Sequence, residues 1–337
     1  MGYVQMSAEE REQISCGLAR GWSERAIARS LQRSPSTINR EMARHGSAAR
    51  YSAVHAQQEA LRRRHHPRRP RKLADRPANR LRQQVLRKLR QHYAPQQIAG
   101  WLRRSYPNQP ECWVSHQTIY TFVELLPKGE FKREVLQCLR HEGKAGKGPT
   151  VVHRPWVAQL IRDRPEDANA RRLPGHWEGD LLLGKAAGGA AVGVLLERVS
   201  RHVRLVKLER HDAYSTYQGF KRKLATVPLH YRKTLAYDQG SEMAEHARLT
   251  QHLGIQVYFC DPHSPWQRAG CENINGLLRQ YLPKGMDMRE VTQSELEWIA
   301  RQLNNRPRKT LNWATPAAVW RAILAGKTFD QAVALGT

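Results

Sequence analysis

The strongest constraint on the fold is a change of pattern at Trp177. From there, three closely spaced runs are apolar or alternate in polarity: WEGDLLLG, AAVGVLLERVS and HVRLVKLER. Such runs are typical of strands, and their close spacing predicts three antiparallel strands. A helical stretch at 212–226, a strand in KTLAYDQG, a helix ending at Gly254 and a strand in IQVYFCD follow. The order predicts an α/β domain with a mixed five-stranded sheet flanked by helices.

The N-terminal residues carry a different pattern, that of three short helices. Ser7 and Glu10 have the spacing of a capping box, Ser23 can cap a second helix, and Pro35 suits the first turn of a third. Two helices joined by a tight turn, the second rich in small polar and basic residues, resemble a helix-turn-helix. An amphipathic bundle whose polar side faces water is the alternative. The side chains predicted to reach a DNA major groove are Arg33, Ser34, Ser36, Thr37, Asn39, Arg40 and Arg44.

A second all-helical block follows a basic segment. Residues 62–72, RRRHHPRRPRK, cannot bury a core, so they are either a solvated tether or an arm that follows DNA. Beyond them, QQIAGWL and SHQTIY echo the earlier ERAIARSL and SPSTIN, which predicts a second helix-turn-helix-like module. The longer YPNQPECWV between the two halves leaves a winged or padded variant open.

These changes of pattern divide the chain into six predicted parts. They are a helix-turn-helix domain at 1–60, a basic linker at 61–76, a second helical DNA-binding domain at 77–142, a connector at 143–174, a catalytic domain at 175–325 and a C-terminal tail at 326–337.

The charge of the chain indicates a polyanionic partner. Lys and Arg number 56 against 30 Asp and Glu, a formal net charge of +26. Basic side chains that neutralise phosphates release condensed counterions, so double-stranded DNA is the predicted partner. A membrane is not expected, because no apolar run approaches the ~20 residues of a spanning helix. The N-terminus lacks signal-peptide features and the five cysteines are scattered, so we expect a cytoplasmic protein.

Three acidic residues stand in settings that suit metal chemistry. Asp180 lies in an apolar strand pattern, Asp238 follows a strand, and Glu272 opens a helical pattern. Carboxylates bind hard cations, and two such ions about 3.5–4 Å apart can assist phosphoryl displacement. The predicted cofactor is therefore Mg²⁺ or Mn²⁺. Glu178 shares a strand face with Asp180, so on residue pattern alone either could be the ligand. For Trp266, in the loop before Glu272, packing against that loop is favoured over stacking on a base.

Several long segments resemble one known family. GHWEGDLLLGK, YDQGSE, DPHSPWQRAGCENINGLLRQYLPKG and LNNRPRKTLNWATPAAVW look like the ribonuclease H-like DDE catalytic domain of insertion sequence 30 family transposases. The N-terminal STINREMARHG is similar to that family as well. The first and second acids are separated by 57 residues and the second and third by 33, a spacing that fits the family.

The resemblance implies metal-dependent DNA cleavage and strand transfer at the ends of a mobile element. It implies Asp180, Asp238 and Glu272 as catalytic metal ligands, and favours Asp180 over Glu178. Terminal repeats and target DNA would be the partners of a nucleoid-associated homo-oligomer that pairs two ends. Arg279 and Lys284 are expected to contact DNA phosphates. The rival functions are a DNA-binding regulator with an inactive catalytic domain and a metal-dependent nuclease that cuts without joining.

Overall fold

A computed structural model describes residues 5–45, 50–65, 72–74, 78–139, 159–185, 189–262 and 264–334. The chain forms two compact units, residues 1–74 and 75–337. Among the described residues, none of the helices has the length and apolar character that a membrane crossing requires.

The first unit is a small helical domain, as its sequence predicts. Its helices are α1 (Ala8–Ala19), α2 (Glu24–Ser30), α3 (Pro35–Ala43) and α4 (Ala53–His65). The capping box at Ser7 and Glu10 is confirmed, since each side chain accepts the other residue's backbone N–H. Ser23 caps α2 and Pro35 opens α3, also as predicted. Helix α4 continues to His65, so the first part of the predicted 61–76 linker is helical.

The core of this domain combines apolar and charged residues. Ile14, Ile27 and Ile38 from the first three helices are buried together. Beside them Arg11 donates to Glu41 at 2.7 Å, and both side chains are buried. A buried charge is tolerated only when it is paired and hydrogen-bonded, so this pair fixes α1 against α3.

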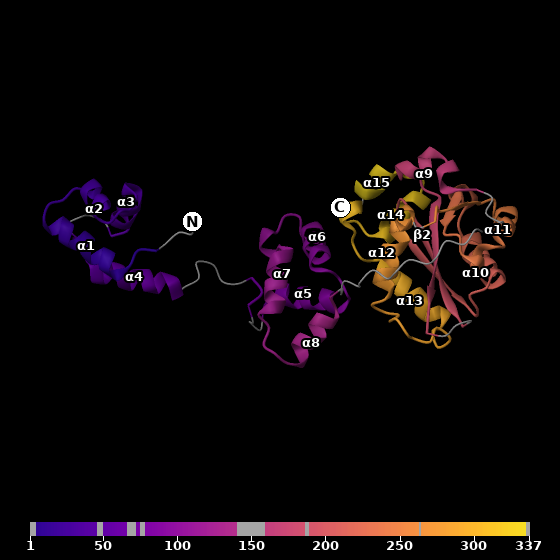
Figure 1. The fold of residues 1–337 in the computed structure, drawn as a ribbon, viewed down its shortest axis with the longest axis horizontal. Helices are drawn as coiled ribbons and strands as arrows, with labels where there is room; N and C mark the ends of the chain where they lie inside the picture. Colours follow the sequence, from indigo (N-terminus) through magenta and orange to yellow (C-terminus); the bar gives the residue numbers. More distant parts are fainter. Residues whose placement is uncertain are drawn as a thin grey trace. The chain divides into compact units, whose positions relative to one another are not determined.

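The second unit begins with another helical block, drawn in Figure 1 as α5 to α8. These helices are α5 (Arg80–Arg90), α6 (Pro95–Ser105), α7 (His116–Glu124) and α8 (Glu130–Gln137). Helices α6 and α7 include the QQIAGWL and SHQTIY segments predicted to be helical, and the Ser115 side chain caps α7. The Tyr93 hydroxyl donates to the carbonyl of Asn305 at 2.8 Å, so this block contacts the C-terminal part of the same unit.

The rest of the unit is built on the predicted mixed five-stranded sheet. Its strands are β1 (His176–Leu183), β2 (Ala191–Glu197), β3 (Val203–Leu208), β4 (Thr234–Tyr237) and β5 (Gln256–Phe259). Their order is β3-β2-β1-β4-β5. The first three strands pair antiparallel, while β4 is parallel to both β1 and β5.

Helices cover both faces of this sheet, and a separate apolar core lies on each face. Figure 1 shows α12 and α13 on one side of the strands and α10 and α11 on the other. The helices on the first side are α12 (Ala269–Leu278) and α13 (Gln293–Asn304), and those on the other are α10 (Ala213–Ala225) and α11 (His246–Leu253). Helices α14 (Pro316–Leu324) and α15 (Phe329–Ala334) pack in the same core as α10 and α11. Strand β2 shows why two cores form, because Leu195 faces one core and Val194 and Leu196 the other.

Three segments depart in detail from their sequence interpretation. The helix predicted after the fourth strand is divided, with a short 3₁₀ turn at Ser241–Met243 before α11. The predicted connector contains α9 (Glu166–Ala170), and residue Leu160 bridges to Phe259 at the sheet edge. The predicted tail contains α15, which packs on the core because apolar residues recur at helical spacing.

Candidate active site

Asp180 and Asp238 lie on neighbouring parallel strands. Glu178 of β1 pairs with Ala236 of β4. Two residues further along each strand, the same register sets Asp180 opposite Asp238, which directly follows β4. Parallel pairing therefore brings together two carboxylates that 57 residues separate in the sequence.

Both carboxylates contact one guanidinium group, that of Arg268. Its Nη2 donates to Asp238 Oδ2 at 3.0 Å, and its Nη1 lies 3.4 Å from Asp180 Oδ1. Nη1 also donates to the carbonyl of Gly179 at 2.9 Å. Sequence reasoning missed this residue, although its position four residues before Glu272 was a usable signal, since such residues share a helix face. Arg268 is the positive charge that allows the two acids to stand together.

Helix α12 presents one stripe of side chains to β1. The Asn275 amide donates to Asp180 Oδ2 at 2.7 Å, and Arg279 donates to the carbonyl of Leu183 at 3.0 Å. Glu272 is three residues before Asn275 and therefore belongs to the same stripe. Its side chain is exposed. Among the described residues no three His, Cys, Asp or Glu side chains form a group that could hold a metal, so the structure does not bring Glu272 into contact with the aspartates.

Glu178 has a different environment from Asp180, although both point to the same side of β1. Its carboxylate is fully buried beneath the start of α12, where Oε2 accepts the Cys271 N–H at 3.0 Å and Oε1 lies 3.3 Å from Arg198 Nε. A carboxylate at a helix N-terminus satisfies a free N–H group and interacts favourably with the helix dipole. Glu178 thus fixes the helix that carries Glu272.

The electrostatics of the site reflect crowding of acids in a partly buried place. Burial raises the pKa of Asp180, the charge of Arg268 opposes that rise, and the negative charge of Asp238 adds to it. Burial alone would lower the pKa of Arg268, but the two carboxylates raise it above its ordinary value. Burial also raises the pKa of Glu242, and Asp238 and Asp180 raise it further. Glu242 is therefore a third acid near the pair.

Four other side chains, those of His176, Trp266, Arg279 and Lys284, have surroundings different from those of the two aspartates. His176 is buried at the start of β1 with Nδ1 2.9 Å from Thr234 Oγ1, and burial lowers its pKa to about 4. The interpretation that Trp266 packs its loop is wrong, because the side chain is 68% exposed. The predicted phosphate contact Arg279 donates to Leu183, as described above, while Lys284 is exposed.

The side chains predicted to read a major groove lie along α3 and the turn before it. Ser34, Ser36, Asn39, Arg40 and Arg44 are exposed and Arg33 and Thr37 are half-buried. Five have partners inside the domain: Arg33 donates to Glu10 at 2.7 Å, Asn39 to Glu24 at 3.1 Å and Arg44 to Glu41 at 3.3 Å, and the Ser34 and Ser36 hydroxyls lie 2.7 Å apart. In the part of the chain that the structure describes, the Arg40 side chain has neither a hydrogen-bond nor an ion-pair partner, so it is the most available of the set.

Two protein families match separate parts of the chain. Residues 3–45 match a helix-turn-helix domain and residues 170–265 match an integrase core domain. The second range contains Asp180 and Asp238 and ends before Glu272.

Relatives extend the likeness to nearly the whole chain. The transposase of insertion sequence element IS1086 from Cupriavidus metallidurans is 46% identical over 97% of this chain and 97% of its own length. The chain belongs to the insertion sequence 30 family of transposases. Transposase InsI for element IS30A of Escherichia coli is 39% identical over 93% of this chain and 82% of its own length. The transposase of element IS4351 from Bacteroides fragilis is 33% identical over 95% and 96%.

Membership of this family confirms the general function that the sequence predicts. The chain is a DNA transposase with a ribonuclease H-like integrase core and an N-terminal helix-turn-helix, as the resemblance implied. A regulator with an inactive catalytic domain and a simple nuclease are not favoured. An enzyme that cleaves and transfers DNA must bind DNA, which agrees with the net charge of +26.

Proposed function

We propose that this transposase cleaves and joins DNA strands with divalent metal ions, Mg²⁺ or Mn²⁺, held by Asp180, Asp238 and Glu272. The observation that carries the proposal is the convergence of Asp180 and Asp238 on Arg268, beside a helix whose stripe includes Glu272. Adjacent carboxylates need a positive counter-charge, and carboxylate oxygens are the ligands that hard cations prefer. The donor set therefore fits such a metal. When bound, the ions would lower the pKa of water and stabilise charge on the phosphate.

The protein's own groups prepare the acids for this role. Asp180 accepts from Asn275 and Asp238 accepts from the backbone N–H of Gly240 at 3.2 Å, in addition to their contacts with Arg268. These donors hold both carboxylates in fixed orientations. A cation competes with Arg268 for the same oxygens. Glu178 anchors the first turn of α12, the helix that carries Glu272.

The proposed reaction has two displacements at phosphorus. In the first, water attacks a phosphodiester at an element end, the P–O3′ bond breaks, the water oxygen stays on the phosphate, and the departing 3′ oxygen takes up the proton that the water loses. In the second, that hydroxyl attacks a phosphate of target DNA, a new P–O bond replaces the old one, and another 3′-hydroxyl leaves. Neither step needs an oxidant or a reductant.

Further parts of the proposal concern partners. We infer that α3 recognises the terminal repeats of the element and that Arg279 and Lys284 contact DNA phosphates. One site must act on two ends, which favours a homo-oligomer that pairs them. The six predicted parts of the chain and the nucleoid location belong to the same proposal.

Substitution of Asp180 by Asn tests the catalytic assignment. The D180N variant removes a negative charge with little change of shape, so nicking and joining of labelled element ends in magnesium should fall by at least a hundredfold while DNA affinity stays within about twofold. The matched control is D330N on α15, where the carboxylate is exposed. Full activity of D180N would remove Asp180 from the site.

A further inference from the structure

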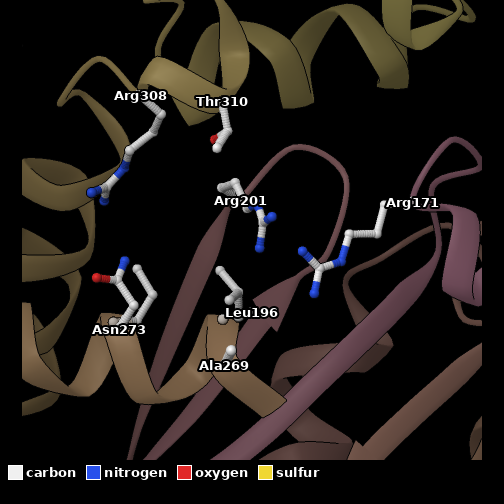
Figure 2. A pocket seen from close by; sticks show the side chains of 9 residues that line it. Arg171, Leu196, Arg201, Ala269, Asn273, Arg308 and Thr310 are labelled. Carbon is white, nitrogen blue, oxygen red and sulfur yellow. The ribbon is translucent and has the colours of Figure 1, made fainter. Parts of the chain in front are cut away.

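A cavity of about 210 Å³ opens beside the first turns of α12. Three arginines from separate segments line it: Arg171 at the end of α9, Arg201 in the β2–β3 connection and Arg308 after α13. Figure 2 shows the guanidinium groups of Arg171 and Arg201 turned toward each other, with Arg308 and Thr310 on the opposite wall from Ala269. Arg308 and Thr310 belong to the family-like segment LNNRPRKTLNW, for which the catalytic proposal has no role.

The positive charge of this cavity is not neutralised by neighbouring acids. Among the described residues, the side chains of Arg171 and Arg201 have no hydrogen-bond or ion-pair partner, and Arg308 donates only to the carbonyl of Leu303. The two carboxylates whose charges act on Arg201 are those of Glu178 and Glu197. Both are committed elsewhere.

Glu178 and Glu197 already have hydrogen-bond or ion-pair partners other than Arg201. Glu178 accepts from Cys271 and pairs with Arg198, as described above. Glu197 accepts the backbone N–H of Gly175 at 3.2 Å and both donors of Ser200 at 2.6 Å. The cavity therefore keeps an excess of cationic donors that would repel one another in the absence of an anion.

The backbone and the buried atoms also indicate a prepared site. Arg171 and Arg201 have φ angles of 53° and 59°, a left-handed conformation that costs energy for side chains other than glycine. Nε of Arg308 is buried without a hydrogen-bond partner. An unsatisfied buried donor is unfavourable, and an anion in the cavity would satisfy it.

The cavity shares helix α12 with the acid pair. A Cβ added to Gly270 would lie 3.2 Å from Arg201 Nη1, so this guanidinium lies directly against the helix backbone two residues before Glu272. Asn273 lines the cavity, while Asn275 on the same helix bonds Asp180. The cavity and the acids thus lie on two sides of the helix that carries Glu272.

We propose that this arginine cavity binds one backbone phosphate of the DNA strand that enters the catalytic site. Planar guanidinium groups form paired hydrogen bonds with phosphate oxygens, and the cavity has room for one phosphate group. The contact fixes the register of the strand relative to Asp180 and Asp238. The choice of DNA as the source of the phosphate rests on the proposed function.

The salt dependence of DNA binding tests this proposal without catalysis. Each phosphate neutralised on duplex DNA adds about −0.9 to the slope of log K against log salt. In magnesium-free buffer with element-end duplex, R201Q and R308Q should each make the slope less steep by up to about 0.9. The double variant should lose no more than one such unit, because both arginines hold the same phosphate. R222Q, on α10 across the sheet, is the matched exposed control and should keep the wild-type slope.

A second measurement uses the unaltered protein, so misfolding of a variant cannot decide the result. Phenylglyoxal modifies accessible arginines, and mass spectrometry of digests reports each site. DNA should protect Arg171 and Arg201 at least fivefold and leave Arg222 reactive, while millimolar inorganic phosphate alone should protect them less. Unchanged slopes in both variants, or equal reactivity with and without DNA, would overturn the proposal. If D180N loses cleavage but keeps the wild-type salt slope and arginine protection, the proposed phosphate site and the proposed catalytic acids are tested independently of each other.

Discussion

At the scale of single residues, the site depends on a balance between two acids and one base. Asp180 and Asp238 approach each other only because Arg268 lies between them, and Asn275 supplies a further donor to Asp180. Like charges at this distance raise each other's pKa, and a guanidinium group lowers it. Arg268 therefore serves as the counter-ion of the two carboxylates.

Substitution of Arg268 by Gln should make the stability of the domain depend on metal. Loss of the guanidinium leaves two carboxylates together, at a cost of roughly 1–2 kcal/mol, less than a fully buried pair because the Asp238 side chain is 45% exposed. The Tm in EDTA should fall, and magnesium should raise the Tm of R268Q more than that of the wild type. R222Q is the control. An equal magnesium shift in both proteins would contradict a counter-ion role.

At the scale of elements, a side chain of β1 fixes the start of α12. The Glu178 carboxylate accepts the N–H of Cys271, and the absence of a side chain at Gly270 leaves room for it, since a Cβ there would lie 2.5 Å from Glu178 Oε2. The sequence AGCEN thus places a glycine, Gly270, at the point where Glu178 of β1 contacts α12. Helix position and acid position are coupled through this contact.

Substitution of Gly270 by Ala should shift α12 and weaken the domain. The added methyl group meets Glu178 Oε2 at 2.5 Å and Leu196 Cδ2 at 2.8 Å, and overpacking of this kind costs about 1–3 kcal/mol. Urea unfolding should show a lower midpoint for G270A. Ala269, exposed at the preceding position, provides the control variant A269S. A wild-type midpoint in G270A would show that Glu178 does not fix the helix.

Helix α3 offers a test of DNA recognition at the same scale. Arg40 is exposed without a side-chain partner among the described residues, whereas Arg33 is held by Glu10. R40Q should therefore weaken binding to element ends by about 1–3 kcal/mol if the side chain reads a base, with a smaller loss on unrelated DNA. R20Q at the end of α1 is the control. Equal losses on both DNAs would assign Arg40 to the phosphate backbone.

At the scale of the whole molecule, the helix-turn-helix and the integrase core belong to separate compact units. Residues 1–74 hold the helix-turn-helix, and residues 75–337 hold the second helical block and the sheet domain. Within the larger unit, His202 connects several elements. Its ring stacks on Trp320 of α14 and lies 3.3 Å from the amide of Asn304 on α13. Helices on both faces of the sheet therefore meet at one partly buried imidazole.

Because of His202, we expect the free energy of unfolding of the larger unit to decrease at acidic pH. Burial lowers the pKa of His202 to about 3, below its ordinary value of about 6.5. The unfolded chain then binds a proton that the folded chain does not, so its contribution to stability decreases as pH falls below about 6.5. Between pH 7 and pH 5 the wild type should lose roughly 1–2 kcal/mol more unfolding free energy than H202Q. Parallel pH profiles in urea unfolding would rule out this role.

The sequence by itself determined the five strands, several of the helices and their order along the chain. Apolar alternation predicted all five strands, caps at Ser7 and Ser23 predicted helix starts, and long ordered segments predicted the family. These features are local, because caps and periodicity act over a few residues. The family resemblance also supplied the three acids, whose joint action is still a prediction.

Only the tertiary structure decided which side chains meet. Strand register set Asp180 opposite Asp238, and packing of α12 on β1 buried Glu178 while Asp180 kept access to solvent. The arginine cavity joins residues 171, 201 and 308, which no local pattern connects. Charges far apart in sequence interact only after folding fixes their distances and removes water from between them, and that information is not contained in any single segment.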